Sequence, residues 1–177
     1  MKKYILGFAI AMAASAGFAQ TTFKSEKYKL SISYDDAWEV NKKATDERNV
    51  ISLMYSAAIT NKPKLAVAFS IVAEDAKFDG NLDKMSFAYE RKLMKRREMT
   101  NTEILSEEII EIGGKKVIQM TGAAHIPFVK QNSNWNIYLF EHAGYYFEVG
   151  LTASKKNFKN KKVKDDYNKL FDSLKLN

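Results

Sequence analysis

The fold of this chain is decided by one stretch, WNIYLFEHAGYYFEVGL at residues 135–151. Large apolar side chains recur at every second position on both sides of Ala143 and Gly144, which is the pattern of two β-strands joined by a tight turn. Glycine permits such a turn at little steric cost. The segment therefore predicts an antiparallel hairpin that is rich in aromatic side chains.

Other parts of the chain show the same alternation of apolar and polar residues. It predicts strands within residues 28–34, 51–55, 65–72, 103–112 and 117–121, and a short return segment at residues 38–40. Both faces of residues 65–72 are apolar or small, which is typical of a central strand. Gly113 and Gly114 predict a second hairpin turn. Because hairpins join antiparallel strands, we expect a mainly antiparallel sheet of about six strands.

Two segments have the three- and four-residue spacing of amphipathic helices. Their apolar stripes are formed by Leu82, Met85, Tyr89 and Leu93 in residues 82–99, and by Val163, Tyr167, Leu170, Phe171 and Leu174 in residues 160–174. Asn81 is expected to cap the first helix. Helices placed between groups of strands predict an α+β fold in which they pack on the sheet.

The order of these segments resembles that of the PsbP-like family. The opening YKLSISYDDAWEV at residues 28–40 is similar to the family's first strand and its P-x-x-W motif, although Asp36 and Ala37 stand where the proline is usual. The central helix, the hairpin at residues 112–116, the aromatic hairpin and the closing FDSLK at residues 171–175 follow in the same order. The resemblance covers about residues 28–175 and implies a PsbP-like α/β/α sandwich.

The resemblance also implies a class of function. The family includes an accessory subunit of the photosynthetic oxygen-evolving complex, a regulator of the Ran GTPase, and bacterial exported proteins of the DcrB type. These are mostly binding or accessory proteins, and they share no catalytic residues that could be transferred to this chain. A shared fold does not by itself determine a function.

The first 19 residues have the three regions of a secretory signal. Lys2 and Lys3 are followed by an uncharged apolar run at residues 4–14, and Gly17 and Ala19 are the small residues that signal peptidase requires. We expect cleavage after Ala19, which leaves one domain at residues 20–177 that is periplasmic or secreted. The apolar run is shorter than the roughly 20 residues of a membrane span, so no transmembrane segment is expected in the mature chain.

Composition limits the partners and the anchoring of the protein. The chain contains no cysteine, which excludes disulfides and the lipid-carrying cysteine of a lipoprotein. Its net charge is +7, and +5 without Lys2 and Lys3, with both signs interspersed. This mild basicity is typical of a soluble surface, and nucleic acid is not an expected partner of an exported protein. A monomer is expected.

No catalytic, cofactor-binding or metal-binding residues are predicted. The chain has only two histidines, His125 and His142, whereas a zinc site typically needs three or four ligands. A thiol nucleophile is impossible without cysteine, and no serine lies in a G-x-S-x-G elbow. The protein is therefore not expected to be an enzyme.

Four residues of the first helix form a candidate partner surface. Phe87 and Met94 lie about 120° around the helix from its apolar stripe. They could pack under a loop, which we favour, or touch a partner. Arg91 and Lys95 are one turn apart and could bind an anion, although cations near a helix C-terminus are also stabilised by its dipole.

Aromatic side chains of the hairpin form a candidate pocket between sheet and helix. It comprises Trp135, Tyr138 and Tyr146, although alternation places Trp135 and Tyr138 on opposite faces and makes most of these aromatics core residues. The first hypothesis is an exported, non-enzymatic binding or accessory module that engages a protein or cell-envelope partner. The alternative is a carrier or sensor of a small ligand, which would need a cavity of about 300 Å³ or more.

Overall fold

The structure is a computed structural model of the 177-residue chain. It describes residues 20–42, 47–56, 67–97, 101–112, 114–126 and 131–177, without the side chains of residues 95–97, 126 and 131. The predicted signal peptide at residues 1–19 lies outside these ranges.

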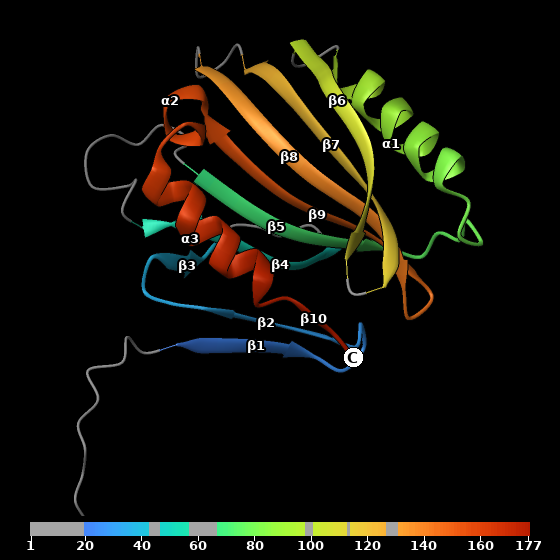
Figure 1. The fold of residues 1–177 in the computed structure, drawn as a ribbon, viewed down its shortest axis with the longest axis horizontal. Helices are drawn as coiled ribbons and strands as arrows, with labels where there is room; N and C mark the ends of the chain where they lie inside the picture. The colour runs from blue at the N-terminus through green and yellow to red at the C-terminus, as the bar shows by residue number, and fades with distance from the viewer. Residues whose placement is uncertain (1–19, 43–46, 57–66, 98–100, 113, 127–130) are drawn as a thin grey trace, which may run out of the picture.

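Seven strands form the main sheet, and all neighbouring strands in it run antiparallel (Figure 1). In spatial order they are β3 (Trp38–Val40), β4 (Asn49–Tyr55), β5 (Val67–Glu74), β9 (Tyr145–Ser154), β8 (Gln131–His142), β7 (Lys115–Ile126) and β6 (Asn101–Ile112). The predicted antiparallel sheet is confirmed. β5 lies inside the sheet, as its two apolar faces indicated, and β6 forms one edge.

A second, smaller sheet packs near the main one. It contains β1 (Thr21–Ser25), β2 (Leu30–Tyr34) and β10 (Lys175–Leu176), with β2 in the middle. The main sheet has seven strands, close to the expected six, whereas a separate three-stranded sheet was not predicted. β1 and β10 have five and two residues, which is too short for a period of two to stand out from the surrounding sequence.

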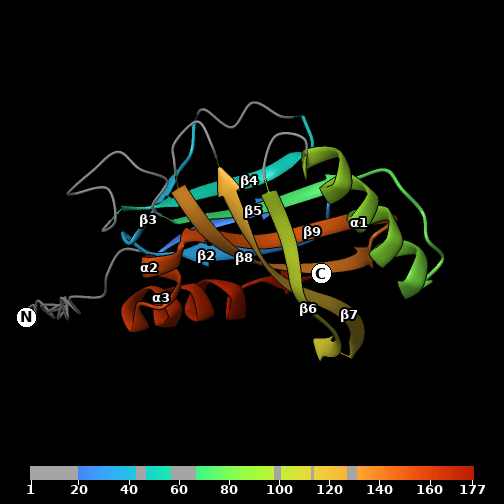
Figure 2. The same cartoon turned by 90° about the horizontal axis from the view of Figure 1, so that it is seen from above.

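Helices cover both faces of the main sheet, and Figure 2 shows α1 (Leu82–Arg97) and α3 (Lys161–Asp172) on opposite sides of it. A single helical turn, α2 (Lys155–Phe158), precedes α3 and was not predicted. Both predicted stripes face the sheet. The stripe of α1 packs on Ile118, Met120 and Leu139, and the stripe of α3 belongs to a separate core cluster. The α+β fold with flanking helices is therefore confirmed.

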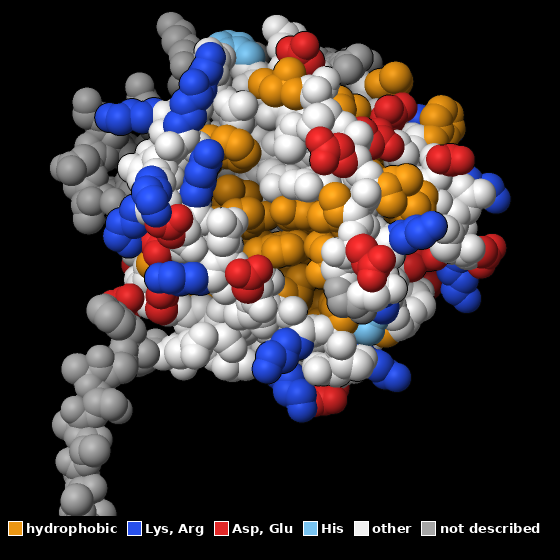
Figure 3. All heavy atoms as spheres, viewed as in Figure 1, with side chains coloured by type: hydrophobic (Ala, Val, Ile, Leu, Met, Phe, Trp, Pro, Cys, Tyr) orange, Lys and Arg blue, Asp and Glu red, His pale blue; other side chains and the backbone are white. Residues whose placement is uncertain are grey.

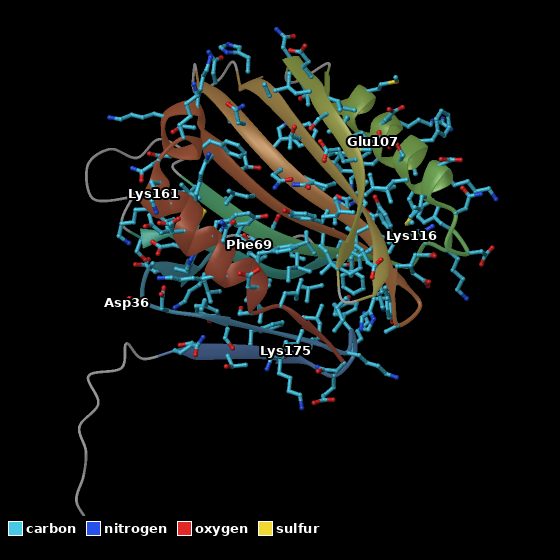
Figure 4. The ribbon with its side chains drawn as sticks, viewed as in Figure 1. Asp36, Phe69, Glu107, Lys116, Lys161 and Lys175 are labelled. Atoms are coloured by element: carbon cyan, nitrogen blue, oxygen red, sulfur yellow. The ribbon has the colours of Figure 1, made fainter. Side chains whose placement is uncertain are left out.

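The larger core lies between the main sheet, α3 and β2. Phe69 of β5 is completely buried there, and its ring centroid lies 6.4 Å from that of Trp38 and 6.2 Å from that of Tyr167. Figure 4 labels Phe69 between α3 and the sheet. Tyr55 Oη donates to Asp166 Oδ2 at 2.6 Å, which ties α3 to β4, and Lys162 Nζ, also on α3, donates to the same oxygen at 2.7 Å.

The charge of Asp166 is maintained by these two donors. Burial alone would raise the pKa of Asp166, but the hydrogen bonds from Lys162 and Tyr55 outweigh it and lower the pKa below its usual value. The carboxylate is therefore ionised at neutral pH and acts as a structural link between helix and sheet.

Candidate functional site

The start of α1 is held on the sheet by side-chain hydrogen bonds. Asn81 Oδ1 accepts from the Lys84 backbone N–H at 3.0 Å, which is the predicted N-cap. Glu141 of β8 accepts from the backbone N–H groups of Phe78 at 2.6 Å and Gly80 at 2.7 Å. Together these contacts determine where α1 enters and which face it presents to the sheet.

Ion pairs anchor one side of α1. Lys92 Nζ lies 2.8 Å from Glu74 Oε1 on β5 and 2.5 Å from Glu148 Oε1 on β9, and Arg48 Nη1 lies 2.9 Å from Glu74 Oε1. Burial would raise the pKa of Glu74, but Lys92 and Arg48 outweigh it and lower the pKa below its usual value. Lys92 therefore directs this side of α1 toward β5 and β9.

The Glu74→Gln variant should reveal this anchor through its pH dependence. A carboxyl whose pKa is lower in the folded than in the unfolded chain stabilises the fold above its unfolded pKa, and that contribution is lost as pH falls through the folded pKa. We expect Glu74→Gln to lower the free energy of unfolding by about 1 kcal/mol at pH 7. Below about pH 4 the difference from wild type should shrink toward zero. Urea unfolding of wild type and variant, at pH 7 and at about pH 3, measures this difference in the free energy of unfolding.

The exposed Glu39→Gln change on β3 is the matched control, since no ion pair involves Glu39 among the described residues. A Glu74→Gln penalty of equal size at pH 7 and at pH 3 would contradict the proposed ionic anchor.

Phe87 and Met94 lie on the other side of α1. At 100° per residue they are about 150° around the helix from Lys92, so they point away from β5 and β9, outward on the β6 side. Their side chains are 60% and 55% exposed, respectively. The expectation that a loop covers them is therefore wrong, because the contacts of α1 with the sheet are made by the opposite stripe.

Arg91 is the basic residue of the candidate partner surface whose side chain the structure describes. The Arg91 guanidinium carbon lies 5.8 Å from the centroid of the Phe87 ring, within the range of a cation–π interaction. Lys95 belongs to α1, but its side chain lies outside the described residues. An anion-binding role for this pair stays a prediction.

Strand β6 adds exposed apolar side chains that the sequence did not single out. Ile109 is 59% exposed and pairs with Ile118, which is buried beneath α1, so Ile109 lies on the α1 face of the sheet. We call Phe87, Met94 and Ile109 the α1–β6 apolar surface. Figure 3 shows hydrophobic side chains over α1 and β6, with acidic side chains among them. Ile109 was missed because strand periodicity does not reveal which strand is the edge.

The three aromatic residues of the candidate pocket do not meet. Trp135 and Tyr146 are buried beneath α1, where they contact Tyr89 and Phe78. Tyr138 lies on the opposite face and stacks on Phe171 of α3, with the ring centroids 4.3 Å apart. Burial raises the pKa of Tyr146, so its phenol remains neutral. The physical reason for the separation is the alternation of side chains along β8.

The described hollows do not supply a closed ligand pocket beside these aromatics. Between sheet and α3, a partly open hollow lined by Val117, Phe140, Phe171 and Leu174 measures about 30 Å³, the size of one water molecule. Figure 3 shows this apolar hollow between α3 and β6. A larger hollow of about 440 Å³ is open to solvent at the ends of β6, β7 and β8. Neither matches a buried site between sheet and helix.

Both histidines have structural hydrogen bonds. His142 Nδ1 accepts from Lys115 Nζ at 2.8 Å, and its Nε2–H donates to the Lys29 carbonyl at 2.9 Å. His125 Nδ1 lies 2.7 Å from Asn132 Oδ1. Within the described part of the chain, no three His, Cys, Asp or Glu residues are arranged to hold a metal ion, and no helix is long and apolar enough to cross a membrane.

The architecture is that of the PsbP-like fold, as the resemblance implied. The chain matches the solution structure of cyanobacterial PsbP from Synechocystis sp. PCC 6803 with a TM-score of 0.64 and 10% identity, over 97% of this chain and 99% of that one. It matches the Ran-binding protein Mog1p of Saccharomyces cerevisiae with a TM-score of 0.58 and 7% identity, over 90% of this chain and 96% of that one.

A third structure, from Bacteroides thetaiotaomicron, matches with a TM-score of 0.54 and 12% identity, over 88% of this chain and 48% of that one. A scan of protein-family models and a search of curated protein sequences found no match. At these identities the likeness establishes the fold and leaves the function to be argued from the surface.

Proposed function

We propose that this protein is an exported, non-enzymatic binding or accessory module whose α1–β6 apolar surface contacts a protein or cell-envelope partner. The observation that carries the proposal is the position of the exposed large apolar side chains. Of the five that the described residues contain, only Val40 lies away from α1 and β6. Exposed apolar residues scattered singly are ordinary, whereas a group of them on one side favours an interaction site.

The apolar side chains of this surface can contribute favourable free energy to recognition. Burying a Phe, Met or Ile side chain stabilises a complex by about 1.5–3 kcal/mol relative to leaving it exposed. Arg91 beside Phe87 adds a polar rim of the kind that surrounds protein interfaces. The fold itself is compatible with such a role, because the similar Mog1p is a Ran-binding protein.

Export is the second component of the proposal. It rests on the charged start, the apolar run and the small residues before Gln20, which together form a cleavable signal. Periplasmic or secreted localisation follows from it. The mature protein is proposed to be a monomer in the absence of its partner.

The test is photo-crosslinking in the exported fraction of the native cell, with the crosslinker at residue 90 beside the surface. We expect the protein there to begin at Gln20. It should crosslink a discrete partner that the Phe87→Ser/Met94→Ser variant loses by about tenfold or more, since about 1.4 kcal/mol corresponds to a factor of ten. The Val40→Ser variant is the control for removal of an exposed apolar side chain. Equal crosslinking by both variants, or a protein that retains Met1 inside the cell, would contradict the proposal.

A further inference from the structure

Strand β6 is a long sheet edge. It spans Asn101–Ile112 and, among the described strands, pairs only with β7. Every second residue of an edge strand points its N–H and C=O outward, where another extended chain can pair with them. A register shift between Ile104 and Ser106 interrupts β6, so the regular part of the edge is Ser106–Ile112.

This regular part is acidic. Glu107, Glu108 and Glu111 are all exposed, and β6 contains no lysine or arginine. On β7, Met120 lies opposite Glu107, Gln119 opposite Glu108, and Lys116 opposite Glu111. Figure 4 labels Glu107 and Lys116. No ion pair involves the three glutamates among the described side chains. On a chain of net charge +7, Glu107 and Glu108 thus have no cation opposite them on β7, whereas Glu111 faces Lys116.

The charges argue against a second copy of this chain as the occupant. Antiparallel pairing of two β6 strands centred on Ile109 would place Glu107 of each copy opposite Glu111 of the other. Like charges directly opposite each other destabilise a strand pair. The glutamates therefore discourage self-association and favour a segment of opposite charge.

We propose that the β6 edge binds an extended, lysine- or arginine-bearing segment of a partner protein as an added antiparallel strand along Ser106–Ile112. This inference rests on the proposed binding function and names the chemistry of the partner. Main-chain hydrogen bonds supply affinity, and alternate side chains supply specificity. The partner residue opposite Ile109 lies on the α1 face, beside the α1–β6 apolar surface.

The register predicts a sequence pattern for the segment. Read from its N-terminus, it should have a basic residue opposite Glu111, apolar residues opposite Ile110 and Ile109, and basic residues opposite Glu108 and Glu107. A blocked peptide of sequence TKIVKKT satisfies this pattern over the seven positions Ile112 to Ser106. A peptide with glutamate at the three lysine positions is the charge control.

The decisive experiment measures binding of these peptides to the purified full chain by titration calorimetry. We expect TKIVKKT to bind and the acidic peptide to bind at least tenfold more weakly. The Glu107→Gln/Glu108→Gln variant should weaken TKIVKKT about tenfold, whereas Glu39→Gln on β3 should leave binding unchanged. Both variants replace exposed glutamates, so unfolding is not expected, and circular dichroism verifies the fold.

N-methylation of the peptide distinguishes strand addition from simple charge attraction. In an added strand only alternate N–H groups face β6, while the others face solvent. Methylation of the N–H groups that face β6 should abolish binding, and methylation of those that face solvent should preserve it. Equal binding of both methylated peptides, no binding of TKIVKKT, or a dimer of the chain formed through β6 would overturn the inference.

The strand-addition inference and the proposed function are contradicted by different results. If TKIVKKT fails while Phe87→Ser/Met94→Ser still loses the crosslinked partner, only the strand-addition inference is wrong. If the crosslinked partner is indifferent to Phe87 and Met94 while the peptide binds as predicted, the apolar surface is the part that fails.

Discussion

Replacing Gly122 by alanine is expected to lower the free energy of unfolding by about 3 kcal/mol, near the upper end of ordinary overpacking costs. Gly122 lies on β7 between Ile104 of β6 and Trp135 of β8. A Cβ atom there would overlap the Trp135 ring and the backbone carbonyl oxygen of Glu103. The backbone cannot rotate away as a side chain can, so β6 would have to move off β7. Urea unfolding of wild type and variant measures the loss.

Two further variants test whether the overlap is the cause. Gly150→Ala on β9 is the matched control, because its Cβ would meet flexible side-chain atoms of Ile137 at 3.0 Å and 3.1 Å. We expect it to cost less than about 1 kcal/mol. In a double-mutant cycle, Gly122→Ala should cost less in a Trp135→Leu background than in the wild type, because only the overlap with Glu103 then remains. Equal penalties at Gly122 and Gly150 would show that close packing around Gly122 is not the determinant.

Replacing Phe69 by alanine is expected to lower the free energy of unfolding by about 4 kcal/mol. The side chain is completely buried and contacts the rings of Trp38 and Tyr167, which belong to β3 and α3. Its removal would leave a cavity where the sheet and α3 meet, and the surrounding strands hold that cavity open. The midpoint of urea unfolding should fall while its slope is unchanged.

The neighbouring Ser70→Ala change is the control for this strand. Ser70 points to the other face of β5 and is half-buried, so its replacement should alter stability by less than about 0.5 kcal/mol. A Phe69→Ala penalty below about 1.5 kcal/mol would mean that the core between the sheet and α3 is looser than its burial indicates.

Local patterns predicted much of the fold. The hairpin turn at Ala143 and Gly144 was placed correctly, and both residues have the positive φ, 50° and 82°, that such a turn requires. The stripe of Leu82, Met85 and Tyr89 also faces the sheet as its spacing predicted. Turns and helical stripes depend on neighbours within a few residues, so the sequence states them directly.

The binding surface was predicted only in part. Phe87 and Met94 were named as candidates, but burial under a loop was favoured for them over exposure. Trp135, Tyr138 and Tyr146 were grouped as one pocket although the sheet separates Tyr138 from the other two. The exposure of Phe87 and Met94 depends on which distant segments pack on α1. The separation of Trp135 and Tyr138 follows from alternation along β8, and Phe171 of α3 then stacks on Tyr138.

By itself, the sequence determined most of the strand and helix segments, though not the short β1, β10 and α2, as well as the antiparallel pairing through hairpins and the absence of cysteine chemistry. These follow from residue type and short-range spacing. Only the tertiary structure decided that β6 is an edge, that Ile109 is exposed on the α1 face of the sheet, and that Glu107 and Glu108 have no cation opposite them on β7. Strand order results from pairing between distant segments, which the period of a single strand does not encode.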